Sequence, residues 1–162
     1  MNRTRRLVTA ALLTSSALVA GLAESRFPLP FPGMRLGIAN VFSLAALVSL
    51  GPAEAAVVSL GRLVMAFSLG GNAIAFACSA GGLALSLPVM TALYKIFPKS
   101  LSVPAISVAG AYAFNIGQLA AIAAIMRTHT VFAYLPPLLL AAAATGYAVG
   151  RTAEWIADRV KL

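Results

Sequence analysis

Seven polar or charged side chains lie within or beside apolar segments, and their chemistry suits ligand binding. They are Glu24, Arg35, Asn40, Arg62, Asn72, Asn115 and Gln118. Such groups are costly to place in lipid, so a functional role is the first hypothesis for them. Guanidinium groups suit an anion such as phosphate, diphosphate or carboxylate. The set therefore predicts a polar substrate-binding pocket in a membrane protein.

Arg62 and one face of a later segment allow a second interpretation. Arg62 lies near the middle of its apolar run, about 10 Å from the end by helical rise. Its guanidinium could bind a ligand or could extend to the membrane interface. Tyr112, Asn115 and Gln118 share an arc of roughly 120° on one helix. These three could contact the ligand or hydrogen-bond to neighbouring helices.

The sequence lacks signatures of catalysis and of metal binding. His129 is the only histidine and Asp158 the only aspartate, so an aspartate-rich magnesium–diphosphate site cannot be built. Cys78 is the only cysteine, which excludes an internal disulfide and a thiolate metal cluster. A glycine-rich loop with Lys and Ser or Thr is also missing. We therefore predict no enzyme activity, no catalytic residue, no metal and no cofactor.

The composition indicates a protein embedded in the lipid bilayer. The 162 residues are 60% hydrophobic and only 10% charged, whereas soluble domains carry about a quarter charged residues. Several apolar runs approach or reach the roughly 20 residues that cross a bilayer. The aromatic residues do not interleave with the basic ones, so nucleic-acid binding is not expected.

We expect one all-α domain, a bundle of six transmembrane helices. The expected spans are residues 7–23, 37–50, 53–69, 73–94, 105–126 and 132–149, with a loop at 24–36 and a basic tail at 150–162. Pro88 and the glycines near it could kink the fourth span.

The basic residues predict the orientation of the bundle. With both termini in the cytoplasm, eight of the 12 Lys and Arg residues lie on the cytoplasmic side and three on the outer side. Cytoplasmic loops of membrane proteins carry such an excess. The sequence therefore predicts a multi-pass protein of the cytoplasmic membrane, with the 24–36 loop on the outer face.

The first apolar run allows more than one role. A basic start, an apolar run and small residues before Glu24 imitate a cleavable signal peptide, but we expect the run to stay as a helix. Ala10, Thr14, Ala17 and Gly21 form a continuous stripe of small side chains along it. Such a stripe lets another helix approach closely, either from the same chain or from a separate partner.

The stretch from Glu24 to Asn40 is polar, rich in proline and flanked by apolar segments. Gly33 and the prolines would let its backbone fold back over the bundle. We expect this stretch to act as a lid or wall of the binding site.

Several segments resemble one known family. PLPFPGMRLGIAN and FNIGQL are the most specific, and GGLALSLPVMTALYK and YLPPLLLAAAATG extend the resemblance from about Leu22 to Gly150. They resemble the Gx transporter family, also named heptaprenyl diphosphate synthase component I. That family is similar to the substrate-binding S components of energy-coupling-factor transporters, which have six helices and cytoplasmic termini.

This resemblance implies partners and a function. It implies a T component and two cytoplasmic ATPases, with the small-residue stripe of the first helix as the docking surface for the T component. The leading hypothesis is a specificity subunit that captures a small molecule at the outer face for uptake. The alternative is an accessory membrane subunit of isoprenoid or quinone metabolism. The ligand itself is left open between an anion and a vitamin, flavin or prenyl compound.

Overall fold

The computed structural model describes residues 2–24, 37–97 and 100–161, and this part of the chain is all helical. Six α-helices occur in it: α1 (Arg3–Glu24), α2 (Ile38–Ser49), α3 (Pro52–Ser68), α4 (Ala73–Ile96), α5 (Val103–Met126) and α6 (Leu135–Lys161). A short 3-10 helix, η1 (Thr130–Tyr134), precedes α6. The described residues form no strand, in agreement with the expected all-α fold.

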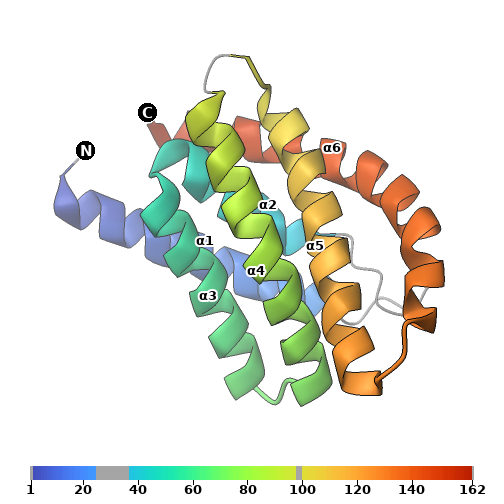
Figure 1. Cartoon of the computed structure of the whole chain (residues 1–162). Helices are drawn as coiled ribbons and strands as arrows, with labels where there is room; N and C mark the ends of the chain where they lie inside the picture. The colour runs from blue at the N-terminus through green and yellow to red at the C-terminus, as the bar shows by residue number, and fades with distance from the viewer. Residues whose placement is uncertain (1, 25–36, 98–99, 162) are drawn as a thin grey trace.

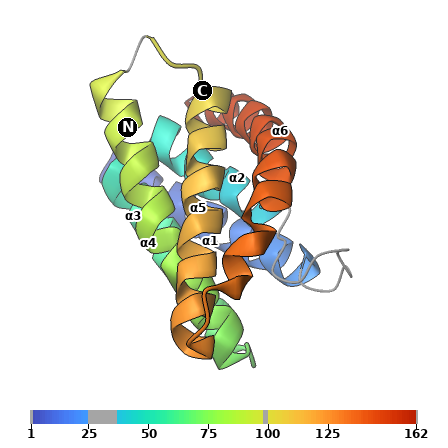
Figure 2. The ribbon, with the colours of Figure 1, turned by 45° about the vertical axis from the view of Figure 1, so that its right-hand side comes forward.

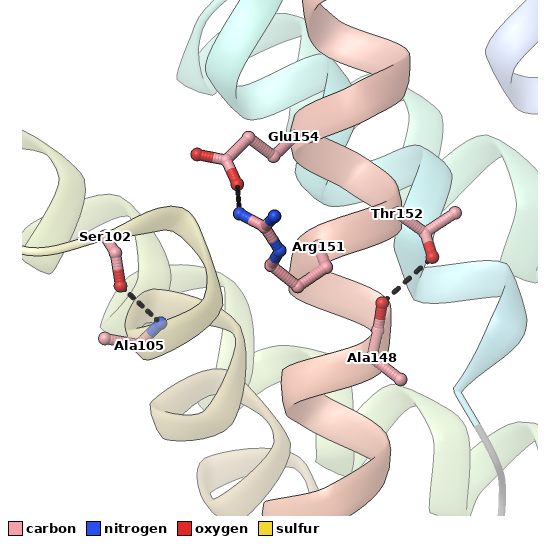
Figure 3. Close-up of polar contacts among 6 residues, drawn as sticks. All are labelled: Ser102, Ala105, Ala148, Arg151, Thr152 and Glu154. Atoms are coloured by element: carbon pink, nitrogen blue, oxygen red, sulfur yellow. Dashed lines mark hydrogen bonds and ion pairs between the residues drawn. The ribbon is translucent and has the colours of Figure 1, made fainter.

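Local sequence sets where these helices begin. Pro52 occupies the first turn of α3, where its missing N–H costs nothing. Asn72 caps α4 by accepting a hydrogen bond of 2.7 Å from the N–H of Ile74. Ser102 caps α5 through the N–H of Ala105, at 3.4 Å (Figure 3). Helix α4 continues through Pro88 to its end at Ile96.

The short helix α2 lies at the centre of the bundle. Helices α3, α4 and α5 run side by side, α1 crosses behind α3 and α4, and α6 curves along the other side of α5 (Figures 1 and 2). Leu44, Ala46 and Leu47 of α2 are almost completely buried. A helix that is apolar on all sides and this short is stable only when other helices surround it.

Both termini lie toward the end of the bundle that carries the α4–α5 connection (Figures 1 and 2). The turns before α4 and before η1 lie at the opposite end.

Glycines set the closest approaches between the long helices. A Cβ atom on Gly81 of α4 would stand 2.7 Å from the carbonyl oxygen of Gly117 on α5. A Cβ atom on Gly146 of α6 would stand 3.0 Å from the Cα of Val108 on α5. Small residues allow such backbone approach between helices in lipid. The α4–α5–α6 layer therefore depends on residues without side chains.

Helix lengths and exposed side chains describe a multi-pass membrane protein. In the described residues, α1, α4, α5 and the segment Thr130–Val160 are long and apolar enough to cross a bilayer. With 12 and 17 residues, α2 and α3 are about 18 Å and 25 Å long, shorter than the hydrocarbon core of about 30 Å. Large apolar side chains such as Leu12, Val64 and Leu140 are exposed on the outside. Four of the six expected spans thus have membrane-spanning length.

Helix α6 is longer than the expected sixth span. It runs without interruption from Leu135 to Lys161, so the helix continues through residues 150–161 of the expected tail. Ala153 and Ala157 are completely buried against the bundle, which holds this last part in place. On the exposed side, Arg151 pairs with Glu154 at 2.9 Å, and Thr152 donates to the carbonyl of Ala148 (Figure 3).

The small-residue stripe of α1 faces the chain's own helices. Ala10, Thr14 and Ala17 are buried. A Cβ atom on Gly61 of α3 would stand 3.3 Å from the methyl group of Thr14, and one on Gly21 would stand 3.5 Å from the Cβ of Ala39 on α2. This placement agrees with one of the two expected roles of the stripe, packing against helices of the same chain. Docking of a separate T component at the stripe stays a prediction.

Arg6 fastens the start of α1 to the α2–α3 corner. One of its guanidinium nitrogens lies 2.6 Å from Oε1 of Glu54 and donates to the carbonyl of Leu50 at 2.7 Å. Both side chains are partly exposed, so the pair is screened and contributes about 1 kcal/mol or less. Arg6→Gln should therefore lower the thermal unfolding midpoint in mild detergent by roughly 1–3 °C.

Two variants control this prediction. Arg5→Gln removes the neighbouring exposed cation and should leave the midpoint unchanged. The double variant Arg6→Gln/Glu54→Gln should lose less stability than the sum of the losses in the two single variants, because either single variant already breaks the same ion pair. Equal effects of Arg5→Gln and Arg6→Gln would mean that the ion pair does not stabilise the fold.

Candidate functional site

A small polar cavity lies inside the bundle, where the start of α2 meets α3, α4, α5 and α6. It has a volume of about 50 Å³, enough for a few water molecules. Its polar lining consists of Glu24, Asn40, Arg62, Ser86, Ser107, Asn115 and Thr145. Four of these residues belong to the substrate-binding set expected from the sequence.

Arg62 and Glu24 bring opposite charges into this cavity, and both side chains are almost fully buried. Oε1 of Glu24 accepts a hydrogen bond of 2.7 Å from the N–H of Gly37, which precedes α2. Nη2 of Arg62 donates to Oδ1 of Asn40 at 3.3 Å. The end of α1, the start of α2 and the middle of α3 therefore meet at one charged cluster.

Helices α4, α5 and α6 supply the other polar groups of the cavity. Nδ2 of Asn115 donates to the carbonyl of Leu138 at 3.4 Å, which ties α5 to α6. Ser86 and Ser107 are buried and line the cavity. Neither serine hydroxyl makes a side-chain hydrogen bond within the described part of the chain. Buried polar atoms normally have partners, so these two hydroxyls are suited to bind water or a ligand.

A second, larger hollow adjoins Arg62 on its other side. This groove has a volume of about 340 Å³ and lies between α1, α3 and α4. Most of its lining is apolar and includes Leu18, Leu22, Leu63, Phe67, Ala75 and Phe76. The ring centroids of Phe67 and Phe76 lie 4.8 Å apart across the α3–α4 hairpin. Arg62 lines both the groove and the polar cavity.

Other residues of the expected set lie apart from the polar cavity. Asn72 caps α4 and lines the far end of the groove. Tyr112 is half-buried and lines neither hollow. Gln118 is buried, lines neither hollow, and its Oε1 has no hydrogen-bond partner among the described residues. A ligand role for these three stays a prediction.

Arg35 and the segment 25–36 lie outside the described residues. The binding role of Arg35 and the lid role of the loop therefore stay predictions. The two ends of the stretch are described: Glu24 and Asn40 both line the polar cavity.

Sequence reasoning missed Ser86, Ser107 and Thr145. Serine and threonine are frequent in the apolar runs, and seven of the 15 in the described α-helices donate to the carbonyl four residues earlier. Ser79 donates to Ala75 at 2.7 Å and Thr145 to Ala141 at 3.0 Å in this way. The residue type alone does not separate such hydroxyls from those of Ser86 and Ser107.

The fold and this site define a class: a helical membrane protein with a small cavity lined by charged and polar side chains, next to a larger, mainly apolar groove. Comparison with known families then identifies the group. The sequence pattern of heptaprenyl diphosphate synthase component I, the Gx transporter family, matches residues 13–156, and the chain belongs to this family. No curated protein matches the chain, and no solved structure does.

Proposed function

We propose that this chain is the substrate-binding subunit of a small-molecule uptake transporter in the cytoplasmic membrane. It takes up its ligand from the outer side, at the end of the bundle opposite the termini. Separate ATPases and a T component supply the energy, because the sequence contains no nucleotide-binding loop of its own.

The polar cavity carries this proposal. An arginine and a glutamate, both almost fully buried, face the same small space in an otherwise apolar bundle. Ionisable groups inside a membrane protein are costly and mark substrate pathways. The hydroxyls of Ser86 and Ser107 add hydrogen-bonding groups that have no partner within the described chain. A purely structural bundle gains nothing from such a space.

Purification of the tagged chain in mild detergent tests the proposal. Recovery of ATPase subunits and a T component supports a transporter. Recovery of a soluble prenyl synthase in their place would contradict the proposed transport function. Native mass spectrometry of the same preparation should detect a small molecule that co-purifies with the chain.

Asn115→Ala should weaken retention of that molecule while membrane insertion stays intact. The substitution removes an amide from the cavity wall and the hydrogen bond to Leu138. A lost hydrogen bond costs about 1 kcal/mol, so we expect roughly a fivefold loss of bound ligand. Native mass spectrometry measures the bound fraction, with Ile116→Ala on the exposed side of α5 as the matched control.

Arg35→Ala is expected to act in the same direction as Asn115→Ala. Unchanged ligand retention in both variants would refute the assignment of the substrate-binding residues.

The family name favours a second candidate function. The matched family is named as component I of heptaprenyl diphosphate synthase. On this reading the chain is an accessory membrane subunit of isoprenoid or quinone metabolism, and another subunit supplies the catalytic carboxylates. The purification experiment above distinguishes the two functions by the partner that is recovered.

A further inference from the structure

The two hollows that meet at Arg62 differ in size and in the charged side chains that line them, and together they indicate the kind of ligand. We propose that the chain binds an amphiphilic anion: its apolar body lies in the groove between α1, α3 and α4, and its anionic group pairs with Arg62. This inference rests on the proposed binding function and names its substrate class.

The volumes of the two hollows indicate that the body of the ligand binds in the groove. The polar cavity, at about 50 Å³, is too small for the body of a ligand and has room only for a polar group or a few water molecules. The groove, at about 340 Å³, falls within the range of small-molecule sites. Apolar side chains from three helices line it, among them Leu18, Leu63 and Phe76. A ligand body held there buries hydrocarbon and needs few hydrogen bonds.

The charged residues that line the groove indicate that the anionic group of the ligand binds Arg62. Arg62 is the single charged side chain among those that line the groove in the described structure. Glu24 lines the polar cavity and is not part of the groove wall. A ligand in the groove therefore meets the guanidinium without meeting the carboxylate. Guanidinium groups form strong, directed hydrogen bonds with carboxylates and phosphates.

Gly21 of α1 keeps the space between groove and guanidinium open. It lines the groove, and a Cβ atom there would stand 3.7 Å from Nη1 of Arg62. Alanine would fit at this distance, whereas a larger side chain would extend into the groove. The groove continues past Phe67 to Gly70 and Asn72 at the α3–α4 turn. A ligand can thus enter from that end with its anionic group leading.

Photolabelling in phosphatidylcholine nanodiscs tests the proposal. The probes are a decanoic acid that carries a diazirine and the corresponding decanol, both corrected for their partition into protein-free nanodiscs. Labelled positions are mapped by mass spectrometry. The acid should label residues 63–79 at least about tenfold more than the alcohol, and unlabelled decanoate should compete. In Arg62→Gln the preference for the acid should disappear.

Gly21→Leu keeps the test independent of the stability of Arg62→Gln. Gly21→Leu should lose the acid labelling, whereas Ile116→Ala, on the exposed side of α5, should label like the unsubstituted chain. Equal labelling by acid and alcohol in the unsubstituted chain would overturn the proposal, as an ordinary membrane lipid in the groove would give this result. Full labelling of Gly21→Leu, or labels spread over exposed Val57 and Leu60, would also overturn it.

The photolabelling experiment tests the ligand class, and the purification experiment tests the transport function, so each can fail without the other. A chain that recovers ATPases but labels equally with both probes keeps its transporter role and loses the amphiphilic anion as ligand. A chain that discriminates acid from alcohol but recovers no ATPase keeps the ligand class and loses the transporter role.

Discussion

Gly117→Ala should lower the thermal unfolding midpoint of the protein by roughly 4–8 °C. At this position α5 lies directly against α4: an added Cβ atom would overlap the carbonyl oxygen of Gly81 and stand 3.1 Å from the Cα of Gly82. These neighbours are backbone atoms, so no side chain can rotate away and the two helices must separate. Overpacking of this kind costs about 1–3 kcal/mol or more, which outweighs the gain of about 1 kcal/mol in helix propensity.

Gly81→Ala tests the same contact from the other helix. Its Cβ atom would stand 2.7 Å from the carbonyl oxygen of Gly117 and 2.8 Å from the Cβ of Ala121. We expect a similar loss of stability. The double variant should lose less than the sum of the two, because one separation of the helices relieves both overlaps.

Gly21→Ala provides the matched control for these glycine variants. It makes the same change within a helix, but its Cβ atom meets neighbours only at 3.5 Å and 3.7 Å. Its midpoint should be equal to or higher than that of the unsubstituted chain. If Gly117→Ala raised the midpoint as much as Gly21→Ala, the close α4–α5 contact would be absent. Differential scanning fluorimetry in mild detergent measures all four variants.

Much of the helical framework could be predicted from the sequence, because breaks in hydropathy coincide with residues that start helices. Gly51-Pro52 and Asn72 interrupt apolar runs, and α3 and α4 begin at these points. The end of α6 could not be predicted this way. Arg151 ends the apolar run, yet the helix continues because Ala153 and Ala157 pack against the bundle. That packing is tertiary and leaves little trace in local composition.

The candidate site was predictable only where its chemistry is rare in apolar segments. Asn40, Arg62 and Asn115 are conspicuous because an amide or a guanidinium is unusual there, and all three line the polar cavity. Ser86 and Ser107 are not conspicuous, since serine and threonine occur throughout these helices and about half of them bond to their own backbone. Most of the groove lining is apolar and does not stand out from the surrounding sequence. The groove exists because α1 crosses α3 and α4 at a position where Gly21 provides no side chain.

Removing the two charges of the polar cavity should change anion affinity in opposite directions. Arg62→Gln removes the guanidinium that faces both hollows and leaves an amide in its place. A hydrogen bond to a charged group contributes about 1.5–3 kcal/mol, so decanoate should bind roughly 10- to 100-fold more weakly. Glu24→Gln removes the carboxylate behind that guanidinium and keeps an oxygen that can accept the hydrogen bond from Gly37. Relief of repulsion across the cavity should tighten decanoate binding by roughly 3- to 10-fold.

The opposite signs separate a binding role from a structural one. Decanoate competition against the photoactivatable acid gives the affinity of each variant, and the thermal midpoint gives its stability. Arg127→Gln, at an exposed position after α5, removes one positive charge that lines neither hollow and should leave the affinity unchanged. If Arg62→Gln and Glu24→Gln both weakened binding and both lowered the midpoint, the two side chains would act by holding α1, α2 and α3 together. Opposite shifts in affinity at similar stability arise only when the field at the bound anion changes, because a loosened bundle weakens binding in both variants.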